Sequence, residues 1–259
     1  MKNVALITGA SSGIGKELAF IHAKQKGDLV VVARRKEELE SLKTEIEKKY
    51  NVEVKVIVKD LTQNNASQEI YNELKQDGVE LEYLINNAGF GGIGKFHERD
   101  WTKDEAMINL NILALTALTR LFLPDFVERD SGRILNVSST ASLIPGPLQA
   151  VYYATKAYVT SFSNAIAEEL HDTKVTVTAL LPGATETEFG KISGMDKTSM
   201  FESTASARKV ANDGYKAMMK GELNKISGLP FSQKLMMAFV PLVPNKMLLK
   251  QVRKMQEVE

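Results

Sequence analysis

The chain has 259 residues, of which 44% are hydrophobic and 25% are charged, and its formal net charge is +1. This length and composition are typical of a globular protein that buries a sizeable core. The near-zero net charge gives no general attraction to nucleic acid, so we expect no nucleic-acid partner. Cysteine is absent, which excludes disulfides and thiolate chemistry and suits a reducing compartment. We therefore expect a cytoplasmic location.

No segment has the pattern of a signal peptide or a membrane span. The apolar run after Asn3 is too short for the hydrophobic part of a signal peptide. The longest apolar candidate, residues 235–243, contains Pro241 and has roughly half the length that a membrane helix needs. We therefore expect no helix that crosses a membrane.

Short runs rich in Val, Ile and Leu alternate with longer helical patterns along the chain. The predicted strands are 4–8, 29–33, 52–58, 81–86, 134–138 and 175–181. The predicted helices are 15–26, 36–50, 66–77, 102–128 and 150–171. Alternating helices and nearly continuous apolar strands favour a parallel sheet that is covered on both faces. The prediction is therefore an α/β, Rossmann-like, doubly wound parallel sheet flanked by helices, as a single domain over residues 1–259.

The turn after the first predicted strand is rich in glycine. Residues 8–15 read Thr-Gly-Ala-Ser-Ser-Gly-Ile-Gly and open the first predicted helix. Glycines let the backbone approach a pyrophosphate, and the N-terminus of the helix offers free N–H groups. A tight turn without a ligand is the alternative, but the order strand, glycines, helix favours a dinucleotide. The predicted contacts are Gly9, Ser11, Ser12, Gly13, Ile14 and Gly15.

Two arginines, Arg34 and Arg35, follow the second predicted strand, and no acidic residue ends that strand. In dinucleotide-binding sheets an acid here binds the ribose 2′-hydroxyl, whereas arginine accommodates a 2′-phosphate. Arginines near the positive end of a helix dipole are unfavourable unless an anion is bound. We therefore predict NADP(H) rather than NAD(H), with Arg34 preferred over Arg35 and with Ser11 assisting.

Polar and small residues also follow the third and fourth predicted strands. Asp60, beside Leu61, can accept a hydrogen bond from the adenine amino group. It can equally cap a helix that begins near Thr62, and the two roles are compatible. Residues 86–89, Asn-Asn-Ala-Gly, close the fourth strand at the edge where ligands bind in such sheets. The predicted contacts are Asp60, Leu61, Asn87, Ala88 and Gly89.

Tyr152 and Lys156 are four residues apart on a predicted helix, so their side chains share one face. An ammonium beside a phenol lowers the phenol pKa from about 10 and makes it a usable acid and base. Such pairs also occur on helices without chemistry. Ser138 and Ser139 end the fifth strand, where a hydroxyl can donate to a substrate oxygen or simply cap a loop.

Together these residues resemble the short-chain dehydrogenase/reductase family of the compact, single-domain type. The matching features are Thr8 to Gly15, Asp60, Asn86 to Gly89, Asn111, Ser139, Tyr152 with Lys156, and Pro182-Gly183 with Thr187. They follow the order of the family from the first strand to about residue 190.

The resemblance implies a role for each matching residue of the reacting end. Tyr152 would be the acid and base, and Lys156 would hold the nicotinamide ribose and depress the tyrosine pKa. Ser139 would position the carbonyl. Asn111 would bend a helix and hold a proton-relay water, with Asn109 as an alternative register.

The resemblance also covers the residues after the sixth strand. Pro182, Gly183 and Thr187 would frame and bind the nicotinamide carboxamide. Glu186 is a departure that can point into the substrate site or to solvent. Tyr153 lacks the four-residue spacing to Lys156 and is expected at a substrate or subunit contact.

Two later segments complete the prediction. Residues 185–204 are predicted to form an irregular substrate lid. The apolar residues of that lid indicate an apolar or amphipathic substrate: Phe189, Ile192, Met195, Met200 and Phe201. Residues 224–259 form a C-terminal cap or tail that is basic and apolar, with Leu248, Val252 and Met255 on one helical face. It either closes the pocket or makes peripheral contact with anionic membrane.

The expected function is reversible, NADP(H)-dependent hydride transfer between the nicotinamide and a small-molecule carbonyl or secondary alcohol. The alternative is a catalytically idle dinucleotide sensor or scaffold, which would not need Ser139, Tyr152 and Lys156 together. No metal is expected, because the three histidines are scattered. A homodimer or homotetramer is expected from the resemblance and from a stripe on helix 150–171: Tyr158, Phe162, Ile166 and Leu170.

Overall fold

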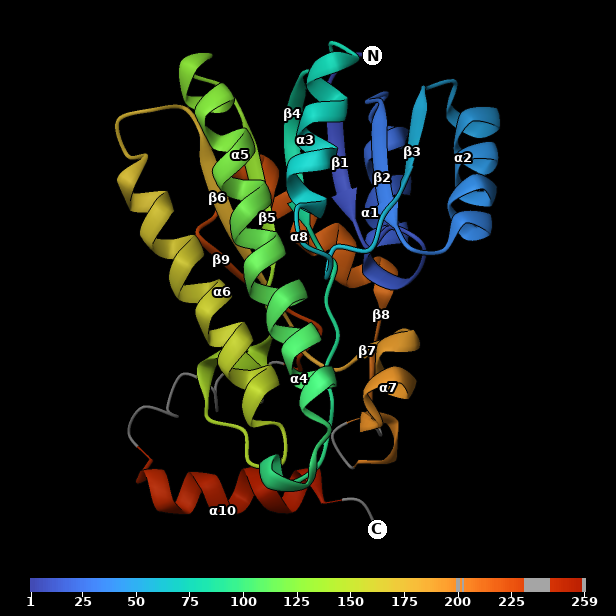
Figure 1. The fold of residues 1–259 in the computed structure, drawn as a ribbon. Helices are drawn as coiled ribbons and strands as arrows, with labels where there is room; N and C mark the ends of the chain where they lie inside the picture. The colour runs from blue at the N-terminus through green and yellow to red at the C-terminus, as the bar shows by residue number, and fades with distance from the viewer. Residues whose placement is uncertain (199–200, 202, 231–242, 258–259) are drawn as a thin grey trace.

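The centre of the fold is a seven-stranded parallel sheet in the order β3-β2-β1-β4-β5-β6-β9 (Figure 1). The computed structural model describes residues 1–259 except 199–200, 202, 231–242 and 258–259. The strands are β1 Val4–Thr8, β2 Leu29–Ala33, β3 Val54–Val58, β4 Leu81–Asn86, β5 Arg133–Val137, β6 Thr176–Pro182 and β9 Asn224–Ser227. The strand order reverses between β1 and β4, which places a crevice at their carboxyl ends. The predicted doubly wound sheet is confirmed.

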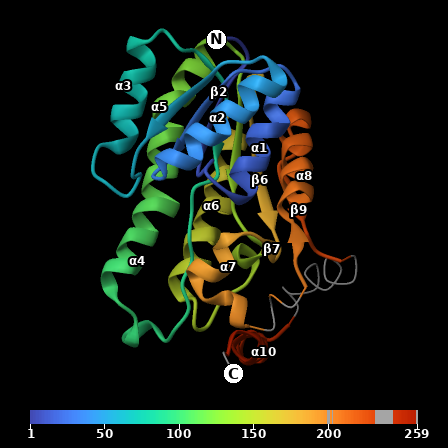
Figure 2. The same cartoon turned by 90° about the vertical axis from the view of Figure 1, so that its right-hand side faces the viewer.

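Helices cover both faces of the sheet (Figures 1 and 2). One layer contains α1 Gly13–Lys24, α2 Lys36–Tyr50 and α8 Ala207–Lys220, and the other contains α3 Ala66–Gln76, α4 Trp101–Ile108, α5 Leu115–Glu128 and α6 Ala150–Glu169. Alternate residues of β1 serve the two layers. Ala5 and Ile7 join the core beneath α1 and α8, whereas Val4 and Leu6 join the core beneath α3 and α5. Continuous apolar strands are therefore buried on both sides.

Two elements of this sheet layer, α8 and β9, were not predicted. Helix α8 buries Val210, Tyr215 and Met218 on one side, and Gly214 lets it approach the sheet. A Cβ on Gly214 would lie 2.5 Å from Leu180 Cδ2. Strand β9 is short and polar, and only its pairing with β6 makes it a strand. The segment predicted as a C-terminal cap from residue 224 therefore begins inside the sheet.

The predicted helix 102–128 is divided by a π-helical turn. Residues Asn109–Ala114 form this turn between α4 and α5. The combined helix Trp101–Glu128 is long and apolar enough to cross a membrane by length and composition alone, contrary to our expectation. Leu118, Phe122 and Phe126 pack into the core beneath the sheet. Burial in the protein core therefore accounts for the apolar character of this face.

The remaining elements gather at the end of the molecule opposite the N-terminus (Figures 1 and 2). They are the 3₁₀ turns Phe96–Glu98, Thr140–Leu143 and Met195–Lys197, the two-stranded sheet of β7 Thr185–Glu186 and β8 Ala205–Ser206, and the helices α7 Glu188–Ser193 and α10 Asn245–Gln256. The segment that was predicted as an irregular lid therefore contains β7 and α7. Helix α10 buries Leu248 and Val252 as predicted, but Gln256 is buried in place of Met255.

Candidate active site

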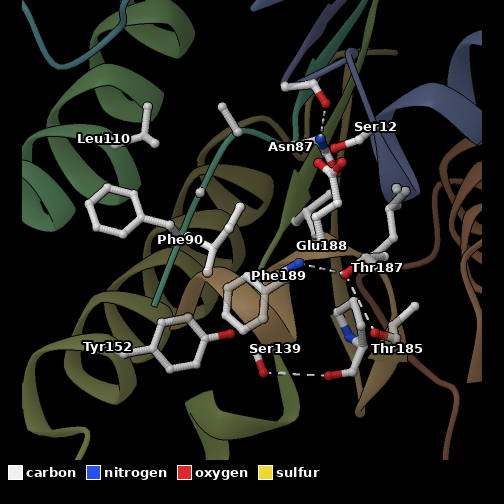
Figure 3. Close-up of a pocket in the computed structure, with 18 of the residues that line it drawn as sticks. Ser12, Asn87, Phe90, Leu110, Ser139, Tyr152, Thr185, Thr187, Glu188 and Phe189 are labelled. Atoms are coloured by element: carbon white, nitrogen blue, oxygen red, sulfur yellow. Dashed lines mark hydrogen bonds between the residues drawn. The ribbon is translucent and has the colours of Figure 1, made fainter. Parts of the chain in front are cut away.

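A cleft of about 380 Å³ opens at the carboxyl ends of the central strands (Figure 3). Its volume lies in the range of small-molecule sites. The predicted residues that line it are Gly9, Ser11, Ser12, Gly13, Ile14, Arg34, Arg35, Asp60, Leu61, Asn87, Ala88, Gly89, Ser139, Tyr152, Lys156, Pro182, Gly183 and Thr187. Gly15 and Asn111 lie behind its wall. Residues from the whole length of the predicted pattern are thus brought to one cleft.

The glycine turn is closely packed against the end of β4. Gly9 has a φ of 67°, a conformation that favours glycine. A Cβ on Gly15 would lie 2.4 Å from Gly9 O and 2.5 Å from Asn87 Nδ2. Asn87 Nδ2 donates to Thr8 O at 2.9 Å and to Gly9 O at 3.3 Å. Gly15 therefore serves the packing of the turn, while the residues before it face the cleft.

The hydroxyl of Thr8 holds the residues that follow β4, a role that was not predicted. Thr8 Oγ1 accepts hydrogen bonds from Asn87 N and Ala88 N, both at 3.0 Å. Asn86 instead points into the core, where its Nδ2 donates to Asn136 Oδ1 at 2.9 Å. In the sequence, Thr8 is visible only as a threonine at the end of a buried strand. Its role could not be predicted, because its hydrogen-bond partner Asn87 lies 79 residues further along the chain.

The two arginines differ in their surroundings. Arg34 is exposed at the edge of the cleft. Arg35 donates to Ser11 Oγ from Nε at 3.3 Å and from Nη2 at 3.1 Å, and it pairs with Glu188 at 2.9 Å. Hydrogen bonding to Glu188 raises the pKa of Arg35. The structure thus brings Arg35 to Ser11, although the sequence favoured Arg34, and the residue that contacts a 2′-phosphate stays a prediction.

Asp60 forms a local turn at the adenine end of the cleft. Its Oδ1 accepts from Thr62 N at 3.0 Å and from Thr62 Oγ1 at 2.8 Å. The predicted capping of a helix near Thr62 is wrong, because α3 begins at Ala66 with Asn65 as its N-cap. Leu61 is buried beside Asp60. A contact between Asp60 and an adenine amino group stays a prediction.

Ser139, Tyr152 and Lys156 meet at the other end of the cleft. Ser139 follows β5, and its hydroxyl lies beside that of Tyr152 on α6 (Figure 3). Ser139 Oγ also donates to Pro182 O at 3.4 Å. Lys156 Nζ donates to Val137 O at 2.9 Å. Ser138 is structural, since its Oγ donates to Lys156 O at 2.9 Å.

The pKa values at this end are set by burial. Desolvation raises the pKa of Tyr152 to about 12, and the hydrogen bond with Ser139 opposes this shift. Desolvation also lowers the pKa of Lys156 to about 8. Lys156 Nζ lies 6.0 Å from the centre of the Tyr152 ring and is bound to a carbonyl. The predicted lowering of the Tyr152 pKa by Lys156 is therefore not found in this arrangement.

Asn111 lies in the π-helical turn and ties three elements together. Its Nδ2 donates to Phe90 O and to Thr155 Oγ1, each at 3.0 Å, and its Oδ1 accepts from Phe90 N at 3.2 Å. A π-helical turn thus lies at the position where a bend was predicted, and such turns often occur at functional sites. A Cβ on Gly89 would lie 3.0 Å from Asn111 Oδ1 and 3.3 Å from Lys156 Nζ. The asparagine and the lysine therefore both lie beside Gly89.

The segment after β6 contacts both ends of the cleft. Thr187 caps α7 by accepting from Phe189 N at 3.2 Å. A Cβ on Gly13 would lie 2.9 Å from Thr187 Cγ2, so this loop closes against the glycine turn. The Phe189 ring lies 5.4 Å from the Tyr152 ring. Glu186 is exposed outside the cleft, and Met200 lies outside the described residues.

Helix α10 contacts Tyr153, which lines the cleft. Gln256 Nε2 donates to the hydroxyl of Tyr153 at 2.7 Å, and both side chains are buried. The Tyr153 ring lies 6.0 Å from the Tyr152 ring. No described residue of α10 lines the cleft, so closure of the pocket by the C-terminal segment stays a prediction. In the described part of the chain, no group of three His, Asp or Glu side chains is placed to hold a metal.

Comparisons with known proteins agree with this geometry. The family model described as short chain dehydrogenase matches residues 3–197. The human very-long-chain 3-oxoacyl-CoA reductase is 36% identical over 198 residues, which are 73% of this chain and 61% of that protein. The NADP-dependent 3-hydroxy acid dehydrogenase of Schizosaccharomyces pombe is 37% identical over 190 residues, 72% of this chain and 73% of that protein.

A solved structure extends the similarity over the whole chain. The short-chain dehydrogenase from Sphingobium yanoikuyae in complex with NADPH superposes with a TM-score of 0.83 at 31% identity, covering 99% of this chain and 98% of that one. The family model thus matches most of the chain. The matched residues include the glycine turn and the cluster of Ser139, Tyr152 and Lys156. The chain belongs to the short chain dehydrogenase family.

Proposed function

We propose that the protein is an NADP(H)-dependent oxidoreductase that moves hydride reversibly between the nicotinamide and a carbonyl or secondary alcohol. The observation that carries the proposal is one continuous cleft. It has the glycine turn and Arg35 at one end, and Ser139, Tyr152 and Lys156 at the other. A dinucleotide is long enough to need both ends, since its phosphates and its nicotinamide are far apart.

The residues of the cleft fit this cofactor. A Cβ at Gly9 would lie 2.8 Å from Asn87 Nδ2 and one at Gly13 would lie 2.9 Å from Thr187 Cγ2, so packing requires glycine at both positions. Both glycines also line the cleft, where their backbone can approach phosphates. The first turn of α1 has no acidic residue, and Ser12 does not cap it, which leaves N–H groups for an anion. Ser11 and Arg35 would hold the 2′-phosphate, and Pro182, Gly183 and Thr187 would frame the nicotinamide.

The bound cofactor would supply or accept the hydride. Tyr152, whose pKa of about 12 keeps it protonated near neutral pH, would donate a proton to the carbonyl oxygen as charge develops there. Ser139 would donate a hydrogen bond to the same oxygen. Lys156 and Asn111, which lie beside Gly89, would hold the ribose and a water that returns the proton to Tyr152.

The substrate is proposed to be apolar or amphipathic. The cleft beyond Tyr152 is lined by apolar side chains: Phe90, Ile144, Phe189, Ile192, Met195 and Phe201. Burying such a surface favours a molecule with a hydrocarbon part. Two relatives named above act on 3-oxoacyl or 3-hydroxy acid compounds, by their names. We propose a carbonyl compound of this general character.

The proposal is tested by the oxidation of NADPH, with NADH in parallel. The panel contains aldehydes, ketones, diketones, steroids and 3-oxoacyl thioesters. We expect turnover with at least one apolar carbonyl compound and a preference for NADPH. Binding of NADPH without turnover of any compound in the panel would favour the idle sensor.

We also propose a homodimer or homotetramer. The predicted stripe on α6 is only partly exposed, because Ile166 and Leu170 pack into the core beside α5. Tyr158 remains exposed, and its hydroxyl hydrogen-bonds to Thr116 on α5 at 3.0 Å. Leu113, which precedes Thr116 in the chain, is 57% exposed. These exposed apolar side chains support association through α5 and α6. A monomer in sedimentation at micromolar concentration would remove this proposal.

For the C-terminal segment we propose a cap over the pocket rather than a membrane contact, and we propose a cytoplasmic location. Leu248 and Val252 of α10 are buried against the domain, so this helix cannot offer them to a bilayer. Its exposed residues include Lys246, Lys250 and Lys254, which attract anionic lipid through charge, and a single strongly exposed apolar residue, Met247, at 66% exposure. We expect little sedimentation with anionic liposomes at low salt. Strong, salt-sensitive sedimentation would support the membrane alternative.

A further inference from the structure

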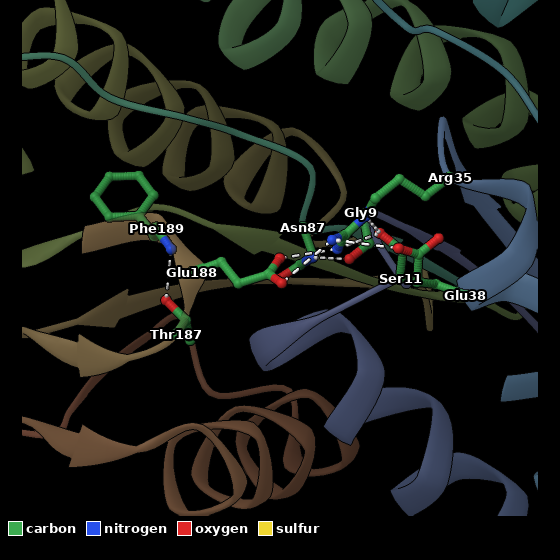
Figure 4. Close-up of polar contacts among 8 residues, drawn as sticks. All are labelled: Gly9, Ser11, Arg35, Glu38, Asn87, Thr187, Glu188 and Phe189. Carbon is green, nitrogen blue, oxygen red and sulfur yellow. Dashed lines mark hydrogen bonds and ion pairs between the residues drawn. The ribbon is translucent and has the colours of Figure 1, made fainter. Parts of the chain in front are cut away.

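Glu188, an acidic residue of the lid, forms an ion pair with Arg35 at the nucleotide end of the cleft (Figure 4). Glu188 is the first residue of α7 and lies 153 residues from Arg35 in the chain. Arg35 Nη1 donates to Glu188 Oε1 at 3.2 Å and Nη2 donates to Oε2 at 2.9 Å. Hydrogen bonding to Arg35 lowers the pKa of this carboxyl most, and the side chain of Ser12 in the glycine turn lowers it further. One carboxylate therefore engages two groups that are placed to hold phosphates.

The guanidinium has too few free donors to hold a second anion in the same way. Arg35 has five N–H groups, and its Nε and Nη2 already donate to Ser11 Oγ. Both terminal nitrogens then donate to Glu188, and Nη1 also lies 3.7 Å from Glu38 Oε1. A phosphate that binds the fork of Arg35 through two parallel hydrogen bonds needs the donors that Glu188 uses.

The pair is nevertheless easy to displace. The side chains of Arg35 and Glu188 are 40% and 50% exposed. An ion pair exposed to this extent contributes little stability, because water and salt screen it. A phosphate carries more charge than a carboxylate and makes stronger hydrogen bonds with a guanidinium. The geometry therefore allows exchange of one anion for the other.

The same residue links the nucleotide end of the cleft to the reacting end. Thr187, just before Glu188, caps α7, and Phe189, just after it, packs its ring 5.4 Å from that of Tyr152. A displacement of Glu188 must therefore shift the first turn of α7 or rotate the Glu188 side chain within it. Phe189 is the neighbour through which such a shift reaches Tyr152.

We propose that Glu188 is an internal anion that occupies Arg35 in the cofactor-free protein, and that the 2′-phosphate of NADP(H) displaces it. The inference rests on the proposed function, which supplies the cofactor. Glu188 then lowers the affinity for 2′-phosphorylated nucleotides and sets the degree to which the protein prefers them over NADH. Its release also frees the beginning of α7 when the cofactor arrives.

The test is the substitution Glu188→Gln, which removes the charge and keeps the size of the side chain. Binding of NADPH, NADH and adenosine 2′,5′-bisphosphate is measured by calorimetry. Removing a competing exposed ion pair should raise the affinity for NADPH and the bisphosphate by about two- to fivefold. The affinity for NADH should rise less. Glu186→Gln is the matched control, since Glu186 is an exposed acid of the same loop outside the cleft, and it should change neither affinity.

A second measurement follows amide hydrogen exchange in α7. The bisphosphate carries the 2′-phosphate but no nicotinamide, so it should speed exchange in Glu188–Ser193 of the wild-type protein and not of Glu188→Gln. An unchanged or weaker affinity for NADPH in Glu188→Gln would overturn the inference, because Glu188 would then be neutral or would position Arg35 for the phosphate. Failure of the wild-type protein to bind any of the three nucleotides would overturn the proposed function itself, and the inference with it.

Discussion

Replacing Tyr152 with Phe should lower turnover by about 10²- to 10⁴-fold, the usual contribution of a positioned general acid. The change keeps the buried ring, which packs against Phe189 and Tyr153, and removes only the hydroxyl, which lies beside Ser139. Affinity for NADPH should change little, because the ring still fills its place in the cleft. Single-turnover rates and equilibrium binding of NADPH separate the two effects.

Tyr153→Phe is the matched control for this prediction. It deletes a hydroxyl on the adjacent ring, which accepts a hydrogen bond from Gln256 at 2.7 Å. This variant should lose some stability through the loosened contact with α10 and should keep most of its turnover. The assignment of Tyr152 fails if Tyr152→Phe retains most of the activity while Tyr153→Phe is inactive.

Replacing Arg35 with Gln should weaken NADPH binding at least tenfold. A hydrogen bond to a charged group contributes about 1.5–3 kcal/mol, and about 1.4 kcal/mol corresponds to a factor of ten. The substitution also leaves the Glu188 carboxylate without its main partner, beside the position of the phosphate. NADH lacks the 2′-phosphate, so its affinity should fall much less. Fluorescence titration with the two nucleotides measures the difference.

Arg34→Gln distinguishes the two arginines. Arg34 is exposed at the edge of the cleft, whereas Arg35 contacts Ser11, so we expect the smaller loss for Arg34→Gln. A larger loss for Arg34→Gln would restore the order that the sequence favoured, with Arg35 serving mainly to hold Ser11 and Glu188. If the wild-type protein prefers NADH, the assignment of a 2′-phosphate to either arginine is wrong.

Much of the fold and of the site could be predicted from local patterns. The bounds of β1, β2, β4 and α2 agree with the predicted ranges, because buried strands read as apolar runs and an amphipathic helix repeats its apolar face. The Tyr152 and Lys156 pair and the glycine turn were found because a helical repeat or a strand-to-helix turn sets their geometry over a few residues, whereas Asn111 was identified only through the family resemblance. Conformations determined by neighbours in the chain can be predicted from the sequence.

Other features depend on contacts between distant segments, and the sequence did not reveal them. Strand β9 is polar and exists through its register with β6, Ala179 opposite Asn224. The contact of Glu188 was missed because its partner Arg35, the N-cap residue of α2, lies 153 residues away in the chain. The pKa of Tyr152 was predicted with the wrong sign, since the spacing shows that Lys156 shares its face but not that burial desolvates the Tyr152 hydroxyl. Desolvation and long-range pairing are properties of the packed structure, so only the tertiary structure decided these features.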